Sequence, residues 1–348
     1  MKRTIGFLLS LFFILFLVAC SSGTAPSGEK NITGIEYPNR PITLVVPYGA
    51  GGTTDLTARQ FAKILEKKLG QTIVVVNQPG ASGVIGTKTV LDAEPDGYTL
   101  LFTADSLGTQ RVMGLSEFSY DDFQPVMAVV DDPKVIVVNK NAPYQTLDDL
   151  VQDMKMRKDK VKMSYTGPGG SGHVQSLIYR TLGLNMSLTA YSSGSECILA
   201  VLGNQVDFTN SNFSTVKGYI ESGDLRVLAV STRERLAEYP EVPTFLEKFP
   251  EAENYFAMPF TPLSIVAEKD MPSEIVDILR MASKEVVKET EWKNYVKSNH
   301  LTPLYEIYPQ EKEILSFYKE WQSRVCWLLW DSGVALNSPQ EYGIERME

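Results

Sequence analysis

The sequence predicts an α/β protein with two domains, and three observations support this prediction. Short apolar runs alternate with segments in which apolar residues recur every three or four positions, a pattern typical of alternating strands and helices. Residues 36–348 number about 310, which is enough for two domains. Asp131, Asp132 and Pro133 separate two strand-like runs, and we expect the chain to enter its second domain there.

The N-terminal segment does not belong to the predicted fold. Two basic residues precede an apolar run that ends at Ala19, so residues 1–19 are predicted to be a secretory signal peptide. The run is short for a membrane-spanning helix, which needs about 20 apolar residues. It leads into Cys20 in a pattern that resembles a bacterial lipobox. We therefore expect Cys20 to be lipidated and residues 20–35 to be a flexible linker, the alternative being an ordinary secreted protein.

Composition excludes several classes of function. The net charge is −9 and the pI is near 5.0. No basic stretch stands out, so we expect no nucleic-acid partner. Apart from Cys20 there are two cysteines, Cys197 and Cys326, which do not make a disulfide framework or a zinc site. They are either free and buried or paired with each other, and we expect neither a metal nor a cofactor.

The first predicted domain comprises residues 36–130 and 256–348 and begins with a βαβαβ unit. A glycine-rich loop precedes its second helix, which ends near Ala93. The other elements of this unit are strands at 42–46, 72–77 and 98–103 and a helix at 54–69. This order predicts a parallel sheet with right-handed crossovers. The returning segment is predicted to add helices at 272–288 and 310–330 and a surface tail.

The second predicted domain, residues 131–255, repeats the alternation of strands and helices. A helix at 146–156 comes first, and a second helix follows the loop at 166–173 and ends at Leu182. The predicted strands are 161–165, 187–191 and 225–231, with a further short strand that starts near Val206.

The loop after the first strand is the first candidate site. It reads "VVPYGAGGTTDLTARQF" (45–61), so glycine-rich backbone leads directly into a helix. A helix N-terminus has about four unsatisfied N–H groups and a partial positive charge, which together suit a carboxylate or phosphate. Thr53 and Thr54 add hydroxyl groups, whereas Asp55 either complements the helix dipole or contacts a ligand. The nucleotide-binding patterns G-x-G-x-x-G and Gly-Lys-Ser/Thr are absent.

The same kind of junction occurs three more times. "NQPGASGVIG" (77–86) follows the second strand, and "TGPGGSGH" (166–173) and "YSSGSE" (191–196) lie in the second domain. Ligands of α/β sheets bind outside the carboxyl ends of the strands. Two domains that present such loops to each other would form a cleft with hydrogen-bond donors on both walls, and a bound anion would favour the closed state.

Four segments of this sequence resemble a known family. "YPNRPITLVVPYGAGGTTDLTAR", "LGQTIVVVNQPGASGVIGTKTV", "PDGYTLLFT" and "LGNQVDF" are similar to the extracytoplasmic receptors of tripartite tricarboxylate transporters, the TctC-like Bug family. The resemblance covers about residues 37 to 305. It implies a type II periplasmic binding protein (Venus-flytrap) fold with a ligand cleft between the domains. It also implies a carboxylate ligand held by backbone amides, hydroxyls and water.

The resemblance also implies the ligand-binding residues. They lie in the glycine-rich loops, after the third strand and in the loop after the strand of "LGNQVDF". In chain order they are Tyr48, Gly51, Gly52, Thr53, Thr54, Asp55, Ala81, Ser82, Ser106, Gly167, Gly170, Ser171, His173, Tyr191, Gly194, Ser195, Asn210 and Asn212.

Several of these residues have a structural alternative. His173 serves equally well as a packing or capping histidine, Tyr48 and Tyr191 as interface residues, and Asn210 and Asn212 as turn residues. The sequence also departs from the family pattern. Ser192 stands where the family often has lysine, and residues 257–272 do not match the family's usual "WxGxxAPxGTP".

The sequence therefore predicts a receptor that is not an enzyme. The resemblance implies that it delivers its ligand to large and small transporter subunits. We expect a monomer that the lipid on Cys20 holds outside the cytoplasmic membrane. One alternative is a subunit that senses the ligand for a membrane kinase. A hydrolase is the other alternative, but only His173 and His300 are available as bases and no G-x-S-x-G motif is present.

Overall fold

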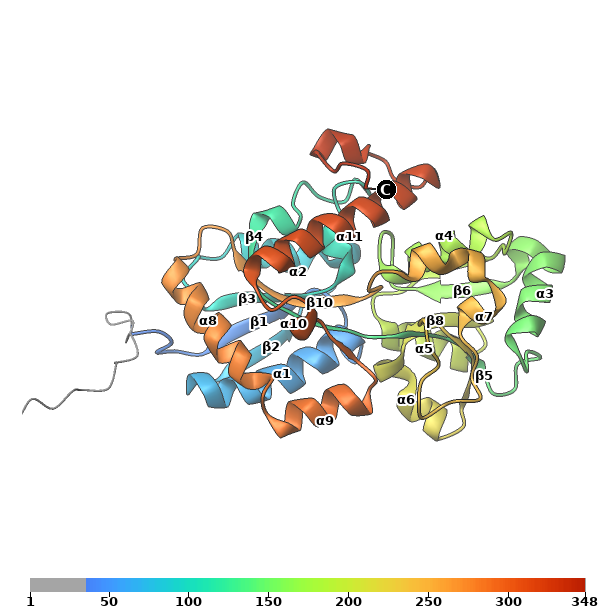
Figure 1. The fold of residues 1–348 in the computed structure, drawn as a ribbon, viewed down its shortest axis with the longest axis horizontal. Coiled ribbons are helices and arrows are strands. Elements are labelled where there is room, and N and C mark those ends of the chain that lie inside the picture. The colour runs from blue at the N-terminus through green and yellow to red at the C-terminus, as the bar shows by residue number, and fades with distance from the viewer. Residues whose placement is uncertain (1–35, 348) are drawn as a thin grey trace, which may run out of the picture. The chain divides into compact units, whose positions relative to one another are not determined.

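Two separate β-sheets organise residues 36–347, which are the part of the chain that the computed structural model describes (Figure 1). The predicted signal peptide, the linker and Cys20 lie outside the described residues. No helix among the described residues is long and apolar enough to span a membrane.

The first sheet has the strand order β11-β4-β10-β3-β1-β2. Its strands are β1 (Ile42–Val46), β2 (Ile73–Asn77), β3 (Thr99–Thr103), β4 (Phe123–Asp131), β10 (Pro262–Glu268) and β11 (Thr302–Pro303). We refer to this sheet and the helices packed on it as lobe 1. The pairs β1–β2 and β1–β3 are parallel, as the βαβαβ order predicts.

Strand β10 changes the predicted sheet. It lies between β3 and β4 and is antiparallel to both, so the sheet is mixed rather than parallel throughout. The sequence patterns assign no element to residues 257–272, so Pro262–Glu268 is a strand that they do not predict. The strand is buried along almost its whole length, so it lacks the polar alternation that marks a half-exposed strand.

Helices cover both faces of the first sheet (Figure 1). On one face α1 (Thr53–Leu69), α8 (Ser273–Val286) and α9 (Thr290–Ser298) pack on a core that includes Leu44 and Phe102. On the other face α2 (Val84–Leu91) and α11 (Glu311–Asp331) pack on Val45 and Leu101. Neighbouring strand residues point to opposite faces, and both faces are apolar because both are covered. Helix α9 is an element that the sequence reading did not predict.

The second sheet, with its helices, forms lobe 2 and has the order β7-β6-β8-β5-β9. Its strands are β5 (Lys134–Asn139), β6 (Lys162–Tyr165), β7 (Ser187–Ala190), β8 (Phe208–Asn212) and β9 (Leu225–Val230). One face packs against α3 (Leu147–Arg157), α4 (Ser171–Thr181) and α7 (Phe245–Lys248). The other packs against α5 (Gly194–Leu202) and α6 (Phe213–Glu221).

Three segments connect the lobes. The chain passes from β4 to β5 at Asp132 and Pro133 and returns through residues 256–261. Helix α11 is the third link, because Phe317 and Trp321 in its first half pack in lobe 1, whereas Cys326 and Leu329 pack in the core of lobe 2. Residues 36–348 accordingly form one compact unit, and the domain limits taken from the sequence remain a prediction.

The segment after α11 is more than a surface tail. The amides of Leu336 and Asn337 donate to the carbonyl of Val112, and Pro339 is buried. The two cysteines of the described residues, Cys197 and Cys326, are both free and buried, which decides between the two alternatives.

Candidate ligand-binding site

The loop between β1 and α1 holds the first group of predicted residues. The first intrahelical bond of α1 runs from the amide of Leu56 to the carbonyl of Gly52 at 3.0 Å, so the amides of Thr53, Thr54 and Asp55 precede it and have no acceptor within the helix. The carboxylate of Asp55 accepts from the amide of Gly51 at 2.9 Å and from Nε of Arg59 at 2.9 Å. These contacts fit the structural alternative for Asp55, because its side chain shapes the loop.

Ser106 joins the two other predicted segments of lobe 1. Its hydroxyl lies 2.6 Å from the hydroxyl of Tyr48 and donates to the carbonyl of Ser82 at 2.9 Å. Ala81 and Ser82 belong to a 3₁₀ turn and have positive φ angles of 47° and 53°. Three loops that are far apart in the sequence therefore meet at the carboxyl ends of β1, β2 and β3.

Loops of lobe 2 lie directly against this group. Ser195, at the start of α5, donates from Oγ to the carbonyl of Ala50 at 2.8 Å, and the amide of Gly49 donates to the carbonyl of Ser192 at 3.3 Å. A Cβ atom on Gly49 would lie 2.8 Å from Cβ of Ser193, so only glycine permits this approach. The loop that precedes α5 in lobe 2 therefore contacts the loop that precedes α1 in lobe 1.

The glycine-rich loop before α4 makes the second contact between the lobes. A Cβ atom on Gly167 would lie 2.8 Å from Oγ of Ser82. The hydroxyl of Thr109 in lobe 1 donates to the carbonyl of Gly169 at 3.0 Å. Together with the contacts of Gly49 and Ser195, these distances show the two sets of loops in contact with each other.

His173 stabilises its own loop. Its Nδ1 accepts a hydrogen bond from the amide of Gly169 at 3.1 Å, and its ring packs beside Tyr165 with 5.5 Å between the centroids. Burial, and to a smaller degree the charge of Arg180, lowers the pKa of His173 to about 4. The side chain is therefore neutral at pH 7, and its capping role matches the structural alternative.

The two predicted asparagines, Asn210 and Asn212, lie within β8 and not in a loop after a strand as expected, and their surroundings differ. Nδ2 of Asn212 donates to the carbonyl of Asp132 at 2.9 Å and to the hydroxyl of Thr261 at 3.0 Å. That hydroxyl lies 3.2 Å from Oγ of Ser171, so Asn212 and Ser171 belong to one network. Asn210 instead bonds to Gln175 and Tyr179 inside lobe 2.

Tyr191 likewise directs its hydroxyl to a partner inside lobe 2, Oε1 of Gln205, at 3.3 Å. Ser192, which stands where the family often has lysine, directly precedes Ser193, the N-cap residue of α5. The amide and the hydroxyl of Ser192 both donate to the carboxylate of Glu196, at 2.9 Å and 2.7 Å. The hydroxyl of Tyr191 thus bonds within lobe 2, whereas Oγ of Ser192 lies beside the first loop of lobe 1, 3.4 Å from the position of a Cβ atom on Gly49.

Two buried carboxylates that the sequence reading did not assign to the site occupy its centre. Asp105 lies in the turn after β3 and accepts from the amide of Ser171, at the N-terminus of α4 in the other lobe. Asp132 lies in the first crossover and accepts from the hydroxyls of Thr53 and Ser214. Asp132 was visible in the sequence only as part of the break between two strands.

Burial dominates the electrostatics of these groups. It raises the pKa of Asp105 and of Asp132 to about 6, and the pKa of neighbouring Asp131 to about 7. Burial also lowers the pKa of Lys134, whose ammonium donates to Oδ1 of Asn212 at 3.1 Å. Three carboxyl groups, of which those of Asp105 and Asp132 are buried, thus act electrostatically on the buried ammonium group of Lys134.

The protein's own groups therefore use part of the donor set predicted for a ligand. The amides of Gly51 and Ser171 donate to the carboxylates of Asp55 and Asp105, and Gly169 donates to His173. In α4 the first intrahelical bond runs from the amide of Val174 to Gly170, so the amides just before Val174 have no intrahelical acceptor.

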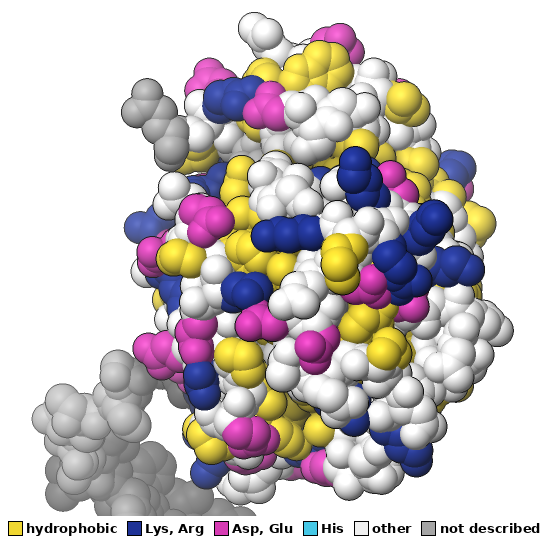
Figure 2. All heavy atoms as spheres, turned by 90° about the vertical axis from the view of Figure 1, so that its right-hand side faces the viewer, with side chains coloured by type: hydrophobic (Ala, Val, Ile, Leu, Met, Phe, Trp, Pro, Cys, Tyr) yellow, Lys and Arg dark blue, Asp and Glu magenta, His cyan; other side chains and the backbone are white. Residues whose placement is uncertain are grey.

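No large charged field replaces these local donors on the face that Figure 2 shows. Lys and Arg side chains are interspersed there with Asp and Glu side chains (Figure 2). The net charge of the chain is −9, so its overall charge does not favour an anion.

Comparison with known proteins identifies the same family that the sequence resembles. A family model described as the tripartite tricarboxylate transporter family receptor (TctC) matches residues 57–328. Protein BugT of Bordetella pertussis is 32% identical over 258 residues, which cover 72% of this chain and 78% of BugT.

Solved structures share the fold. The periplasmic binding protein BugD superposes with a TM-score of 0.78 at 27% identity, over 86% of this chain and 99% of BugD. A protein from R. palustris solved with adipate has a TM-score of 0.76 at 24% identity, over 86% of this chain and 99% of its own. The predicted two-domain periplasmic binding protein fold is confirmed.

Proposed function

Because this chain belongs to the family of tripartite tricarboxylate transporter receptors, we propose that it binds a small organic carboxylate between its lobes and delivers it to a membrane transporter. The protein acts outside the cytoplasmic membrane, and the lipid on Cys20 anchors it there. The large and small membrane subunits of the transporter are its partners.

One observation carries this proposal: helix N-termini and glycine loops of both lobes converge at one place. The start of α1 and the 3₁₀ turn at Ser82 belong to lobe 1, and the starts of α4 and α5 belong to lobe 2. Such termini favour carboxylates through unpaired N–H groups and the helix dipole. A ligand that contacts both sets stabilises the closed arrangement by differential binding.

The buried carboxylates suggest how the ligand is admitted. In the structure Asp105 holds the amide of Ser171, and Asp132 holds the hydroxyl of Thr53. A ligand carboxylate accepts the same kind of hydrogen bond and competes for the same donors. We therefore infer that the protein's own acids hold the loops until a ligand carboxylate takes over part of their contacts.

The geometry also favours binding over hydrolysis. Ser171 Oγ lies near the hydroxyl of Thr261, and the Nδ1 atom of His173 is used by the amide of Gly169. With its pKa lowered to about 4, His173 is a poor match for a general base near pH 7. Ser171 and His173 therefore serve better as parts of a loop that holds ligand.

Calorimetric titration with a panel of carboxylates tests the proposal. Malate, adipate, citrate, glutamate and benzoate form a suitable panel, and we expect saturable one-site binding of at least one with a dissociation constant in the micromolar range or below, about −8 kcal/mol. Thr53→Val removes a hydroxyl at the start of α1 and should weaken that binding about tenfold. Thr290→Val makes the same change at the exposed start of α9 and should leave affinity unchanged.

Two results would contradict the proposal. One is a folded protein that binds no member of a broad carboxylate panel and carries no co-purified acid. The other is equal affinity in the Thr53→Val protein and the wild type, which would place the ligand away from α1.

The anchor and the partner need separate experiments. Cys20→Ser should move the protein from the membrane fraction to the soluble fraction without changing its affinity for ligand. Crosslinking in membranes should recover transporter subunits. Recovery of a sensor kinase in their place would overturn the delivery role while leaving the binding site intact.

A further inference from the structure

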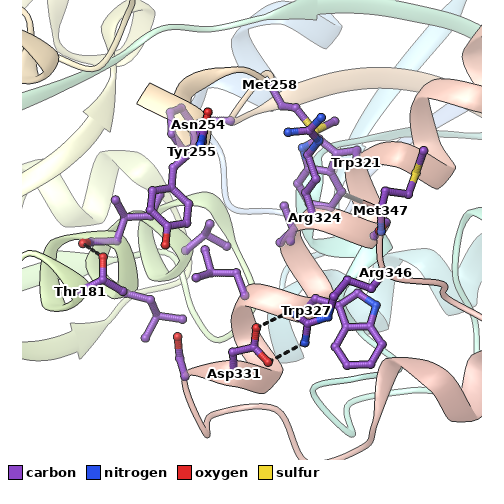
Figure 3. Close-up of a pocket in the computed structure, with 18 of the residues that line it drawn as sticks. Thr181, Asn254, Tyr255, Met258, Trp321, Arg324, Trp327, Asp331, Arg346 and Met347 are labelled. Carbon is purple, nitrogen blue, oxygen red and sulfur yellow. Dashed lines mark hydrogen bonds and ion pairs between the residues drawn. The ribbon is translucent and has the colours of Figure 1, made fainter. Parts of the chain in front are cut away.

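A cavity lies away from the loops described above. Its volume is about 610 Å³, and it is bounded by α4, by the crossover segment around Asn254–Phe260 and by the second half of α11 (Figure 3). Arg346 and Met347, near the end of the chain, complete the wall. None of the residues predicted for the carboxylate site lines this cavity.

The walls are largely apolar and aromatic. Leu177 and Ile178 come from α4, Phe260 from the crossover segment, and Trp321 and Leu328 from α11. Figure 3 shows Tyr255 on one side of the space, and Trp321 and Trp327 on the side formed by α11. A volume between about 300 and 1,000 Å³ with apolar and aromatic walls is typical of sites for small organic ligands.

The polar groups of the cavity carry an excess of positive charge. Three arginines line it, Arg180, Arg324 and Arg346, against one carboxylate, Asp331. Asp331 is already engaged, because both of its oxygens accept from Arg346 at 2.8 Å. A cationic lining is notable in a chain whose net charge is −9.

Arg324 has unused donor capacity. Its Nη2 atom lies 3.2 Å from the carboxylate of Glu320 one helical turn earlier, an exposed pair of a kind that contributes little. Its Nε atom is buried and has no acceptor among residues 36–347. A guanidinium group offers five N–H donors in a planar fork that matches a carboxylate or sulfonate.

We propose that this cavity is a second binding site, which takes an amphipathic anion: one carboxylate or sulfonate group on an aromatic or medium-length aliphatic body. The apolar body lies against Leu177, Phe260 and Leu328, and the anionic group pairs with Arg324. This inference does not depend on the proposed function of the cleft. Apolar burial and a charge-assisted hydrogen bond both favour such a ligand over a small polar acid.

The cavity lies between α4, which begins at the loops between the lobes, and α11, which packs in both lobes. Helix α4 carries Ser171 and His173 at its N-terminus and lines the cavity with Val174 and Leu177. Helix α11 packs in both lobes. A ligand between α4 and α11 therefore contacts the structure that positions the glycine-rich loop, and its affinity is expected to differ between open and closed lobes.

Fluorescence titration of the full chain with 1-anilinonaphthalene-8-sulfonate tests the proposal. We expect one saturable site on the folded protein, with decanoate competing and acetate not competing. Arg324→Gln should weaken binding about tenfold. Arg157→Gln removes the arginine of a comparable i,i+4 ion pair in α3 and should have no effect.

A filling variant tests the position of the ligand. Leu328→Trp places a larger side chain in the cavity and should abolish binding, whereas Leu315→Trp, at an exposed position on the same helix, should not. Tyr255→Ala, at an exposed lining position, should weaken binding and keeps the test decisive if the tryptophan variant does not fold. The proposal would be overturned if Arg324→Gln and Tyr255→Ala gave the same titration curves as the wild type. It would also be overturned if the dye bound at several weak sites and decanoate did not compete.

Discussion

The carboxylate of Asp105, in the turn after β3, accepts a hydrogen bond from the backbone amide of Ser171, the first residue of α4 in the other lobe. One lobe thus supplies a carboxylate to a helix N-terminus of the other, where a bound acid would find the same partial positive charge. Asp132 has a related position, since it accepts from Thr53 of α1 and Ser214 of α6. Both contacts lead to measurable predictions.

Stability should fall as the pH rises from about 4 to about 7. The pKa values of Asp105 and Asp132 are raised to about 6 by burial, so the folded state binds more protons than the unfolded state in this range. The stabilising contribution of each raised group is fully present below pH ~4 and is lost as the pH rises through the folded pKa. His173, whose pKa is lowered to about 4, acts in the opposite direction between pH ~4 and ~6.5 and offsets part of the effect.

A single substitution isolates this effect. Asp132→Asn keeps an acceptor for Thr53 but does not ionise, so its free energy of unfolding should fall less between pH 4.5 and 7.5, by on the order of 2 kcal/mol. Urea unfolding at both pH values gives the comparison, with exposed Asp92→Asn as the control. Equal pH dependence in wild type and Asp132→Asn would contradict the assignment.

Gly49→Ala should hinder closure of the lobes. The added Cβ would lie 2.8 Å from Cβ of Ser193 in lobe 2, so the two loops must separate. We expect a larger radius of gyration by small-angle X-ray scattering and about tenfold weaker binding of any ligand held by both lobes. Gly218→Ala, in a helix with open space around the new atom, is the matched control and should stabilise α6 by up to ~1 kcal/mol.

Replacement of His173 should separate the contribution of its hydrogen bond to Gly169 from the contribution of its packing. In His173→Phe the amide of Gly169 loses its acceptor, which should lower the free energy of unfolding by about 1–3 kcal/mol. His173→Asn provides an acceptor near the position of Nδ1 and should retain more of the stability. Thermal unfolding at pH 7.5 measures both variants, and equal losses would show that His173 acts by packing alone.

Both internal cysteines should be unreactive in the folded protein. Burial raises the pKa of Cys197 and of Cys326 to about 12, so little thiolate forms at pH 8. In a Cys20→Ser chain, titration with a thiol reagent should show no rapid reaction until guanidinium is added, and two thiols afterwards. A dependence of the melting temperature on reductant would instead indicate a disulfide.

The elements with regular local patterns could be predicted from the sequence. Helix α1 has apolar residues at helical spacing and a terminal glycine, and β2 is a β-branched run before a glycine-rich loop, so both were predicted within a residue or two. Strand β10 was missed because its partners, β3 and β4, lie more than 100 residues earlier in the chain. Its burial on both faces exists only once those strands and the helices that cover them are in place.

The candidate site was also only partly predictable from the sequence. Glycine-rich loops at strand ends and the resemblance to a receptor family were visible in the sequence, and family membership and fold are confirmed. The placement of Asp105 and Asp132 at helix N-termini was not visible, because each acid lies far along the chain from the groups that it contacts. The site residues as a set remain a prediction that binding experiments must test.

By itself the sequence determined the alternation of strands and helices, the anion-compatible loops and the family, because backbone preferences and apolar periodicity act over a few neighbouring residues. Only the tertiary structure decided that β10 inserts antiparallel, that α11 packs in both lobes, and that Asp105 contacts Ser171. Those features depend on burial and hydrogen bonding between residues that are distant in the chain, and no local pattern specifies which distant partners will meet.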